Sequence, residues 1–535
     1  MKFDDCKNLN DFEDFYPLRK NLDANAEITR IAPSPTGMPH IGTGMQAILD
    51  RALADKNNGI FILRIEDTDQ ARSVPGAVDA IIEGLNWLKT IPQEGPTTGG
   101  EYGPYTQSER LPLYKIACDH LVEKGEAYRC FCSSERLDEV RNLQIKNKKT
   151  PMYDQKCRHL TDEEIWKNLD AGQTFVVRMK VPAHEDIVIV DEIRGSITFK
   201  SETIDDSVIM KTDGFPTYHL ASIVDDHFMR VTTVVRGEEW VPSTPKHILL
   251  YRAFGWKAPR FLHTVLLRDA QKRKLSKRSG DTSLNWFRRQ GFLSEGFTNF
   301  LTRIMWTHPD GSDVYPHADF VNLMQTKNLP STGPVVDIKL LQFINSHYIH
   351  KMTDKERTEA FVAYLEYLIA HKQTVSNTVD PAVEAEECDA ETIRKMHDEI
   401  VADLDYTYQI MSVKPGRFDR LGDMIFNNTY FYDSTFEYPA LEKLQKHADL
   451  GRVRGILEKF SAMYEQRPTE IDLIMKEIAK ELELQDKQVF MVLRLVLTGF
   501  ERTPPLPEIL PVLGAKRMHR RFSGMIETIN KEFHA

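Results

Sequence analysis

The stretch that decides the fold of the N-terminal half is Arg30-Ile-Ala-Pro-Ser-Pro-Thr-Gly-Met-Pro-His-Ile-Gly-Thr43. It begins in an apolar run at 28–32, crosses a loop bent by glycine and proline, and enters a segment at 38–56 that reads as a helix. A second apolar run follows at 60–65, and such runs are typical of strands covered on both faces. Together they predict a β-α-β unit, and therefore a parallel sheet with a right-handed crossover.

The end of this stretch has the features of an anion site. Gly37, Gly42 and Gly44 let the backbone approach a ligand closely, and Pro39 suits the first turn of a helix, where no amide donor is lost. A helix N-terminus offers free N–H groups and about half a positive charge. His40 can donate a hydrogen bond to a phosphate oxygen there, although an isolated histidine in such a turn is more often an ordinary surface residue.

A compact basic cluster, Lys274-Leu-Ser-Lys-Arg278, lies far along the chain on a predicted loop. Either segment alone is weak evidence for a function. Together they offer two cationic, hydrogen-bond-donating surfaces that can close on a triphosphate from opposite sides.

Composition limits the class of protein. A chain of 535 residues is too long for one core, and a net charge of −10 gives no bulk basicity to indicate a nucleic-acid partner, although local fields can still attract one. No apolar run approaches the roughly 18–20 residues of a membrane span, so we expect no membrane partner. Six cysteines do not indicate a disulfide scaffold, and residues 1–27 fit neither a secretory signal nor a transit peptide. A cytoplasmic location is expected.

The pattern along the chain predicts an interrupted α/β domain. Sheet-like sequence returns at 208–211 and 230–235, after an insertion near 106–211 that mixes helix and strand signals. After about residue 282 strand signals largely vanish, and amphipathic helical segments continue to the C-terminus.

The motifs stand in a context that resembles the class I aminoacyl-tRNA synthetases, specifically the bacterial and organellar type of glutamyl-tRNA synthetase. The two signatures of that class, His-Ile-Gly-His and Lys-Met-Ser-Lys-Ser, stand here as His40-Ile-Gly-Thr43 and Lys274-Leu-Ser-Lys-Arg278. The resemblance runs from about residue 28 to the end and is densest to about 300. Further matching stretches are Leu63-Arg-Ile-Glu-Asp-Thr-Asp69, Gly103-Pro-Tyr-Thr-Gln-Ser-Glu-Arg110, Lys211-Thr-Asp-Gly-Phe-Pro-Thr-Tyr-His-Leu-Ala221, Val224-Asp-Asp-His227, Val235-Arg-Gly-Glu-Glu-Trp240 and Ser243-Thr-Pro245.

The resemblance implies an α/β fold: a split Rossmann-type parallel-sheet catalytic domain with an inserted α+β acceptor-binding domain, followed by an all-α C-terminal anticodon-binding region. The domains expected from it are an N-terminal extension (1–27), the first half of the catalytic domain (28–105), the inserted tRNA acceptor-binding domain (106–211), the second half of the catalytic domain (212–270), the Lys-Leu-Ser-Lys-Arg loop with a stem-contact helical domain (271–353), and the α-helical anticodon-binding domains (354–535).

The resemblance also assigns the nucleotide site. It implies that ATP, accompanied by Mg²⁺, is used to activate L-glutamate, with His40 and Lys277 as the catalytic residues. Attack of a carboxylate on the α-phosphate spreads negative charge over oxygens, so catalysis is mainly positioning and electrostatic stabilisation. The residues expected at ATP are Gly42, Thr43, Trp240, Lys274, Ser276 and Lys277.

The glutamate pocket implied by the resemblance contains two arginines, whose planar forks match carboxylates. On spacing alone Arg30 could equally be a strand-end arginine paired with a nearby acid. The expected set is Arg30, Ala32, Ser34, Glu66, Tyr218 and Arg236. Related sequences often carry Asn where this chain has Ser222, so a place for Ser222 in the pocket is doubtful.

Three cysteines cluster in the insertion, as Cys130-Phe-Cys132 and Cys157. Thiolates are preferred zinc ligands, and a closed four-ligand site would be structural. Some bacterial glutamyl-tRNA synthetases bind zinc here through three cysteines and a tyrosine, which implies Tyr153 as the fourth ligand. Generic ligand chemistry favours His159, which stays as the alternate.

The implied function is glutamate–tRNA ligase, with tRNA(Glu), L-glutamate and ATP as partners and a monomeric state. The helical C-terminal half fits the anticodon-binding region of the bacterial type, where Lys414 or Arg417 could read the anticodon or could be ordinary surface charges. The alternatives are a glutaminyl-specific relative, a non-discriminating enzyme that also charges tRNA(Gln) with glutamate, and an inactive tRNA-binding protein.

Overall fold

The computed structural model describes residues 2–20, 22–23, 25–269, 271–273, 275, 282–380, 383–413 and 418–534. The chain divides into two compact units. Unit 1 comprises Met1–Asn285 and Thr298–Asp337, and unit 2 comprises Trp286–Phe297 and Ile338–Ala535.

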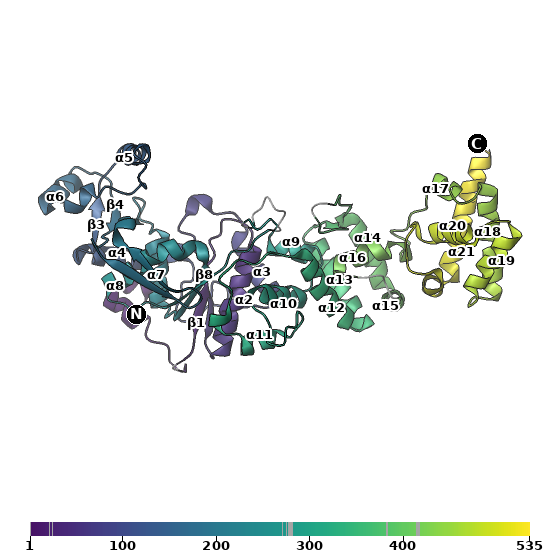
Figure 1. The fold of residues 1–535 in the computed structure, drawn as a ribbon, viewed down its shortest axis with the longest axis horizontal. Helices are drawn as coiled ribbons and strands as arrows, with labels where there is room; N and C mark the ends of the chain where they lie inside the picture. The colour runs from purple at the N-terminus through teal and green to yellow at the C-terminus, as the bar shows by residue number, and fades with distance from the viewer. Residues whose placement is uncertain are drawn as a thin grey trace. The chain divides into compact units, whose positions relative to one another are not determined.

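Parallel strands form the centre of unit 1, as the sequence predicts (Figure 1). Strand β1 (Ile28–Ile31) pairs with β2 (Ile60–Leu63), and β8 (Thr233–Gly237) pairs with β9 (Arg260–Thr264). A backbone hydrogen bond of 2.9 Å from Thr232 N to Ile28 O joins β1 to the residue preceding β8. The carboxyl ends of β1 and β8 therefore lie together, and they carry Arg30 and Arg236.

Helix α2 (Ile41–Lys56) is the crossover between β1 and β2 and packs on both strands. It begins three residues later than the expected helix at 38–56, so Pro39 precedes it. The start is fixed because His40 Nδ1 accepts from Gly42 N at 3.1 Å, while the carbonyl of Pro39 accepts from Leu284 N at 2.9 Å. Gly44 has no room for a side chain, since a Cβ there would lie 2.9 Å from Leu284 and from Leu88.

The segment predicted as an insertion contributes to two sheets. One is antiparallel, with β4 (Val176–Met179) between β3 (Ala127–Cys130) and β7 (Val208–Met210). The hairpin of β5 (Asp186–Asp191) and β6 (Gly195–Lys200) instead extends the sheet of β8 and β9, through Asp191 opposite Phe261. The boundaries expected for the domains, including 106–211 for the insertion, remain a prediction.

Besides α2, the described helices of unit 1 are α1 (Leu9–Phe15), α3 (Ala77–Trp87), α4 (Leu111–Glu123), α5 (Ser134–Lys146), α6 (Asp162–Asp170), α7 (Tyr218–Phe228), α8 (Thr244–Phe254) and α11 (His317–Leu323). Helices α4, α7 and α8 pack against these sheets. Two helices, α9 (Leu284–Arg289) and α10 (Ser294–Met305), have residues in both units.

The N-terminal segment, residues 3–19, packs into unit 1. Phe12 and Tyr16 are fully buried in one core with α4 and α7. Arg19 forms a two-pronged ion pair with Glu94, at 2.6 and 2.9 Å, and Glu13 pairs with Arg230 at 2.7 Å. Sequence reasoning assigned this segment no role, because its neighbours are distant in the chain.

Unit 2 is helical around one core, and its helices are α12 (Ile338–Lys351), α13 (Asp354–Ala370), α14 (Ala390–Ala402), α15 (Leu404–Ser412), α16 (Leu421–Asn428), α17 (Leu441–Gln445), α18 (Leu450–Gln466), α19 (Ile471–Glu481), α20 (Asp486–Thr498) and α21 (Leu506–His534). The path of α21 breaks at Gly514, where φ is 76°. Short strands β10 (Val375–Ser376) and β11 (Glu387–Cys388) form the small sheet of this unit.

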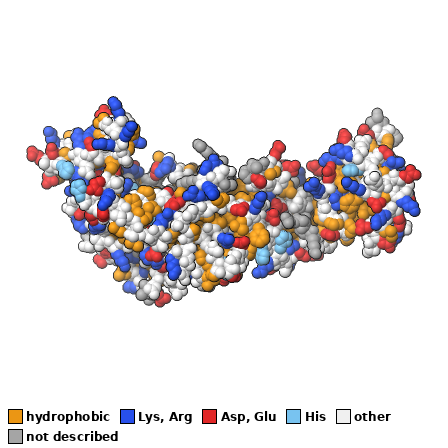
Figure 2. All heavy atoms as spheres, viewed as in Figure 1, with side chains coloured by type: hydrophobic (Ala, Val, Ile, Leu, Met, Phe, Trp, Pro, Cys, Tyr) orange, Lys and Arg blue, Asp and Glu red, His pale blue; other side chains and the backbone are white. Residues whose placement is uncertain are grey.

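The surface carries charges of both signs. Basic and acidic side chains are intermixed on the face shown in Figure 2, in keeping with the net charge of −10. Within the described ranges, no helix combines the length and apolarity needed to span a bilayer.

Candidate active site

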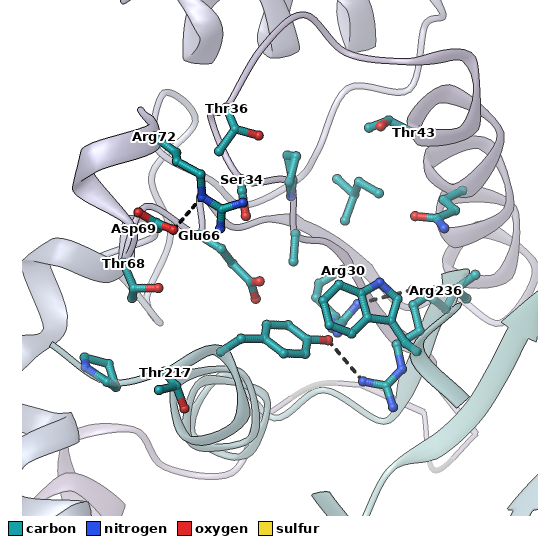
Figure 3. A pocket seen from close by; sticks show the side chains of 18 of the residues that line it. Arg30, Ser34, Thr36, Thr43, Glu66, Thr68, Asp69, Arg72, Thr217 and Arg236 are labelled. Carbon is teal, nitrogen blue, oxygen red and sulfur yellow. Dashed lines mark hydrogen bonds and ion pairs between the residues drawn. The ribbon is translucent and has the colours of Figure 1, made fainter. Parts of the chain in front are cut away.

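A cavity of about 540 Å³ opens where β1 and β8 end. In Figure 3, Thr43, on the first turn of α2, lies at upper right and Thr217 at lower left, with Glu66 and Arg30 between them. The lining is Arg30, Ile31, Ala32, Pro33, Ser34, Thr36, Thr43, Gln46, Glu66, Thr68, Asp69, Arg72, Lys211, Pro216, Thr217, Tyr218, Val235, Arg236 and Trp240. Ligands of open α/β sheets bind in this position, outside the carboxyl ends of the strands.

Arg30 is held by acidic groups. It is 3% exposed, and its Nε donates to Asp226 Oδ1 at 3.0 Å. Arg64 Nη1 donates to the same oxygen at 2.7 Å, and Arg64 Nη2 donates to Glu66 Oε1 at 3.0 Å. Arg30 therefore pairs with an acid and also lines the cavity, and its place in a glutamate pocket stays a prediction.

These contacts belong to a larger buried group that we call the carboxylate network: Arg30, Arg64, Glu66, Arg110, Asp225 and Asp226. Asp225 accepts from Arg110 Nε at 2.7 Å and from the hydroxyl of Tyr114 at 2.8 Å. Burial alone would raise the pKa of Asp226, but Arg30 and Arg64 hold it below its usual value. Burial dominates at Glu66 and raises the pKa of that carboxyl, while only its Oε1 is engaged by a described residue.

Arg236 has a different environment. It is 4% exposed, and each nitrogen of its guanidinium donates to a neutral acceptor. Nε donates to His263 Nε2 at 3.0 Å, and Nη1 donates to the Tyr218 hydroxyl at 3.0 Å and to His247 Nδ1 at 3.2 Å. Nη2 donates to Thr244 Oγ1 at 2.8 Å. No carboxylate of the described residues forms an ion pair with Arg236.

The hydrogen-bond directions show that three histidines around Arg236 are neutral. We call His219, His247 and His263 the imidazole cluster. Arginine can only donate, so His263 Nε2 and His247 Nδ1 must be unprotonated acceptors. His263 then donates from Nδ1 to Asp191 Oδ2 at 2.7 Å, and His247 donates from Nε2 to His219 Nδ1 at 3.2 Å. Burial lowers the pKa of all three rings, to about 4 for His219.

The predicted phosphate-facing loop lies at the other side of the cavity. Because His40 Nδ1 accepts from Gly42 N, a neutral His40 carries its proton on Nε2, and His40 itself is not among the residues that line the cavity. Thr43 lines the cavity, while Gly42 lies in the turn before it.

The second motif falls largely outside the described residues, since Lys274, Ser276, Lys277 and Arg278 are not among them. The segment that follows it is described. Ile41 N donates to Thr282 O at 2.9 Å, and Ser283 forms a β-bridge with His40. The chain after the second motif is thus bonded directly to the first.

A separate sulfur-rich group lies at the end of β3. The sulfurs of Cys130, Cys132 and Cys157 are all within 4.8 Å of one another, and those of Cys132 and Cys157 are 3.5 Å apart. The Tyr153 hydroxyl lies 3.3 Å from Cys130 Sγ and 3.4 Å from Cys132 Sγ. His159 is exposed and outside this group of metal-binding side chains.

The structure brings the sequence-predicted glutamate residues around one cavity, together with Trp240, whose ring lies 4.3 Å from that of Tyr218. Ser222 is buried, its hydroxyl has no hydrogen-bond partner among the described residues, and it does not line the cavity. Sequence reasoning gave no role to Asp225, Asp226 or the imidazole cluster. The available signal was two adjacent aspartates in an otherwise apolar part of α7.

A second cavity, of about 870 Å³, lies within unit 2. Polar and aromatic side chains line it, among them Tyr430, Phe500, Arg502 and Thr503. It lies in the part of the chain predicted to bind the anticodon.

Comparisons with known proteins agree with this architecture. Residues 28–343 match the family model of the catalytic domain of class I tRNA synthetases (E and Q), and residues 359–526 match an anticodon-binding domain. The chain is 46% identical over 525 residues to a glutamate–tRNA ligase of Gloeobacter violaceus, covering 96% of this chain and 98% of that one. It is 38% identical over 496 residues to a glutamate–tRNA ligase of Thermus thermophilus, covering 92% and 98%.

A solved structure extends the match. The crystal structure of a glutamate tRNA ligase from Elizabethkingia meningosepticum, in complex with its amino acid, superimposes with a TM-score of 0.74 at 29% identity, covering 94% of this chain and 99% of that one. The parallel sheet, the helical second unit and the matches over most of the chain lead to one conclusion: this chain belongs to the class I tRNA synthetase family that contains the glutamate and glutamine enzymes.

Proposed function

We propose that this protein is a glutamate–tRNA ligase that activates L-glutamate with ATP and transfers it to the 3′-terminal adenosine of tRNA(Glu). The observation that carries the proposal is the cavity that places two buried arginines and Glu66 beside the N-terminus of α2. The relatives at 46% and 38% identity bear the same activity in their names. A helical second unit with an anticodon-binding match supports tRNA as the partner.

The proposed amino-acid site is built from complementary charges. Arg30 and Arg236 supply guanidinium N–H donors and positive charge for the two carboxylates of glutamate, and Glu66 accepts from its ammonium group. Tyr218 accepts from Arg236 and keeps its own O–H to donate. Ala32 and Ser34 line the wall. Glutamine would turn an amide N–H₂ toward an arginine fork, and a polar mismatch of this kind discriminates by about 10⁴ or more.

The proposed first step joins glutamate to the nucleotide. An oxygen of the α-carboxylate attacks the α-phosphorus of ATP, forming a P–O bond, and the bond to the bridging oxygen breaks so that pyrophosphate leaves with the electron pair. The carboxylate is already ionised, so no base is needed. His40 and the positive end of the α2 dipole stabilise the phosphate oxygens, while the N–H groups of Ile41, Gly42 and Thr43 already donate to Thr282 O, His40 Nδ1 and His40 O.

The remaining nucleotide contacts are proposed on the family pattern. Lys277 balances charge on the departing pyrophosphate, with Lys274 and Ser276 beside it, and Trp240 lies on the adenosine side. The bonds from Thr282 and Ser283 to the α2 start support this, since Thr282 follows Lys277 by five residues in the sequence. Mg²⁺ accompanies the triphosphate. In the second step a hydroxyl of the terminal adenosine attacks the acyl carbon, and AMP leaves.

The cysteine group fits a structural zinc ion. Tetrahedral zinc with bonds of about 2.3 Å to sulfur separates its sulfurs by about 3.8 Å, close to the 3.5 Å between Cys132 and Cys157. The Tyr153 hydroxyl, next to Cys130 Sγ, would be the fourth donor beside the three cysteine sulfurs. His159 lies outside this group. Arg136 Nη1 lies 3.4 Å from Cys132 Sγ, which balances thiolate charge. Zinc would supply a crosslink within the segment proposed to receive the tRNA acceptor end.

The zinc proposal has a direct test. Elemental analysis of the purified protein should find about one zinc per chain, and Tyr153→Phe should lower the zinc content, whereas His159→Gln should not. If His159→Gln lowered the zinc content and Tyr153→Phe did not, His159 would be the fourth ligand in place of Tyr153. A protein without zinc would refute the site.

We also propose domain boundaries, a contact for the anticodon loop, an oligomeric state and a location for this protein. The boundaries given above place the acceptor-binding domain at 106–211 and the anticodon-binding domains at 354–535. The second cavity, with Phe500 and Arg502, is a candidate contact for the anticodon loop, since aromatic rings stack on bases and arginine pairs with phosphates. The Lys414 and Arg417 candidates lie outside the described residues. A monomeric, cytoplasmic enzyme is proposed.

The test is ATP–pyrophosphate exchange with purified protein and transcripts of tRNA(Glu) and tRNA(Gln). Glutamate should support exchange, glutamine should not, and tRNA(Glu) should be charged with glutamate. Lys277→Ala should slow exchange by orders of magnitude, with Lys327→Ala as a surface control in unit 1. Exchange with glutamine alone, or none with any amino acid, would overturn the proposal. Charging of tRNA(Gln) with glutamate would mark the non-discriminating form of the same activity.

A further inference from the structure

Arg236 lines the cavity, and the Nε of its guanidinium group is hydrogen-bonded to a buried histidine, His263. Among the described residues, Arg236 Nε has a single acceptor, His263 Nε2 at 3.0 Å, whereas Nη1 has two acceptors. His263 is fully buried, and it does not line the cavity itself. Its Nε2 also lies 3.1 Å from Thr244 Oγ1, which accepts from Arg236 Nη2, so both contacts of this nitrogen lead to Arg236.

A second residue sets the tautomer of this histidine. Asp191 Oδ2 accepts from His263 Nδ1 at 2.7 Å and from the backbone N of His263 at 2.9 Å. Its Oδ1 accepts from the backbone N–H groups of Ile193 at 3.0 Å and Arg194 at 2.8 Å. With its proton held on Nδ1, the ring presents the lone pair of Nε2 to Arg236.

This arrangement differs from the usual way of holding a buried arginine. A carboxylate in place of His263 would neutralise the guanidinium and compete with an anionic ligand. A neutral imidazole fixes the plane of the guanidinium and leaves its charge for the ligand. After the four bonds donated to described residues, one N–H of Nη2 remains for a further acceptor.

We propose that His263, fixed by Asp191, is a positioning residue that orients Arg236 for a substrate carboxylate without neutralising it. The inference rests on the function proposed above, in which Arg236 binds glutamate. It adds two residues from outside the cavity, on β9 and at the end of β5, to the determinants of amino-acid binding.

The test compares two substitutions of His263 by ATP–pyrophosphate exchange with tRNA(Glu) present. His263→Leu removes the acceptor and should raise the KM for glutamate by about ten- to hundredfold, the usual effect of losing a hydrogen bond to a charged group. The KM for ATP should stay within about twofold. His263→Gln offers a carbonyl oxygen in place of Nε2 and should restore most of the affinity for glutamate.

Asp191→Asn is an independent test that deletes no heavy atom. If its oxygen keeps the two backbone bonds of Oδ1, its N–H₂ faces His263 and forces the ring proton onto Nε2, toward Arg236. An aspartate-to-asparagine change of this kind gives a histidine the wrong tautomer. The KM for glutamate should therefore rise here as well. This variant decides the question if His263→Leu does not fold.

The control is a second histidine–aspartate pair in unit 1. His308 Nδ1 lies 2.5 Å from Asp310, away from the cavity, so His308→Leu should leave the KM for glutamate unchanged. If the wild-type protein activates glutamate but the folded His263→Leu and Asp191→Asn variants keep its KM for glutamate, the inference is wrong and the proposed function stands. A wild-type protein that does not activate glutamate would instead overturn the proposed function and the inference with it.

Discussion

Two arginines line the same cavity, yet the molecule holds them in opposite ways. Arg30 belongs to the carboxylate network, where Asp226 bonds both it and Arg64. Arg236 belongs to the imidazole cluster, where its partners are histidine, tyrosine and threonine. Both guanidinium groups are nearly fully buried, so the difference does not arise from access to water.

On the proposed function, the difference separates a structural charge from one kept for a ligand. A buried ion loses its hydration, and a paired ion recovers much of that loss from its partner. Arg236 recovers less, because neutral acceptors provide hydrogen bonds without an opposite charge. The carboxylate network should therefore stabilise the fold, while the imidazole cluster holds a cation at a cost in stability that a bound carboxylate can offset.

The largest effect is expected in the carboxylate network. Asp225 is fully buried and accepts from Arg110, Tyr114 and Gln107. Asp225→Asn leaves buried arginine charge uncompensated and should lower the free energy of unfolding of unit 1 by about 3–5 kcal/mol. Urea unfolding followed by circular dichroism measures this.

The matched control for Asp225 is an exposed ion pair. Asp119 pairs with Lys115 at 2.6 Å on α4, with side chains 47% and 74% exposed. Asp119→Asn should change the free energy of unfolding by less than about 1 kcal/mol. Equal losses in the two variants would remove the distinction between the network and the surface.

The next effect compares the two arginines directly. Arg30→Met leaves Asp226 with Arg64 alone and should cost about 2–3 kcal/mol of stability. Arg236→Met removes a buried cation that has no acidic partner, so stability should stay within about 1 kcal/mol of wild type. Both variants should lose glutamate-dependent exchange. A loss of stability in Arg236→Met as large as in Arg30→Met would show that the comparison is wrong.

A third prediction uses acid to separate the two groups. Burial lowers the pKa of His219 from 6.5 to about 4, so between these values the unfolded chain binds a proton that the folded chain does not. The contribution of neutral His219 to the free energy of unfolding is therefore fully present above pH 6.5 and is lost as the pH falls toward 4. Asp226, whose pKa lies below 3.8, contributes stability that persists through this window and is lost only at lower pH.

His219→Gln should therefore be less sensitive to acid than wild type. Relative to pH 8, it should lose about 2 kcal/mol less stability at pH 4.5. The measurement is the urea midpoint of unit 1 at both pH values. His184, whose side chain is 88% exposed, provides the control, since His184→Gln should follow wild type. Parallel curves for His219→Gln and wild type would contradict a neutral imidazole cluster.

The sequence predicted the secondary structure around the two arginines better than it predicted their hydrogen-bond partners. The strands and the crossover helix follow from local patterns, because buried parallel strands and a proline-glycine loop can be recognised in a short window, whereas the two arginines were assigned only through the resemblance to the family. The partners of the arginines were not predictable in that way. Asp226 lies 196 residues from Arg30, and His263 lies 27 residues from Arg236 on a neighbouring strand, so only the register of the sheet brings them together.

The N-terminal segment shows the same limit. Its composition is polar and gave no indication of packing, yet the Tyr16 hydroxyl lies within the core of unit 1. It donates to Gly103 O at 2.7 Å and accepts from Arg110 Nη1 at 3.0 Å. Burial raises the pKa of Tyr16 to about 12, so the hydroxyl stays neutral and can serve both bonds. The segment is thereby attached to the carboxylate network at Arg110.

The smallest effect is expected for this attachment. Tyr16→Phe keeps the ring in place and removes both hydrogen bonds, while Arg110 Nη1 retains the carbonyl of Pro104 at 2.9 Å. Stability should fall by about 1–2 kcal/mol, as measured by urea unfolding, with the KM for glutamate unchanged. Phe15→Leu, at a half-buried neighbour without a hydroxyl, controls for loss of ring packing. A raised KM in Tyr16→Phe would mean that the carboxylate network, too, transmits its geometry to the substrate, and the division between a structural and a ligand-directed arginine would then no longer hold.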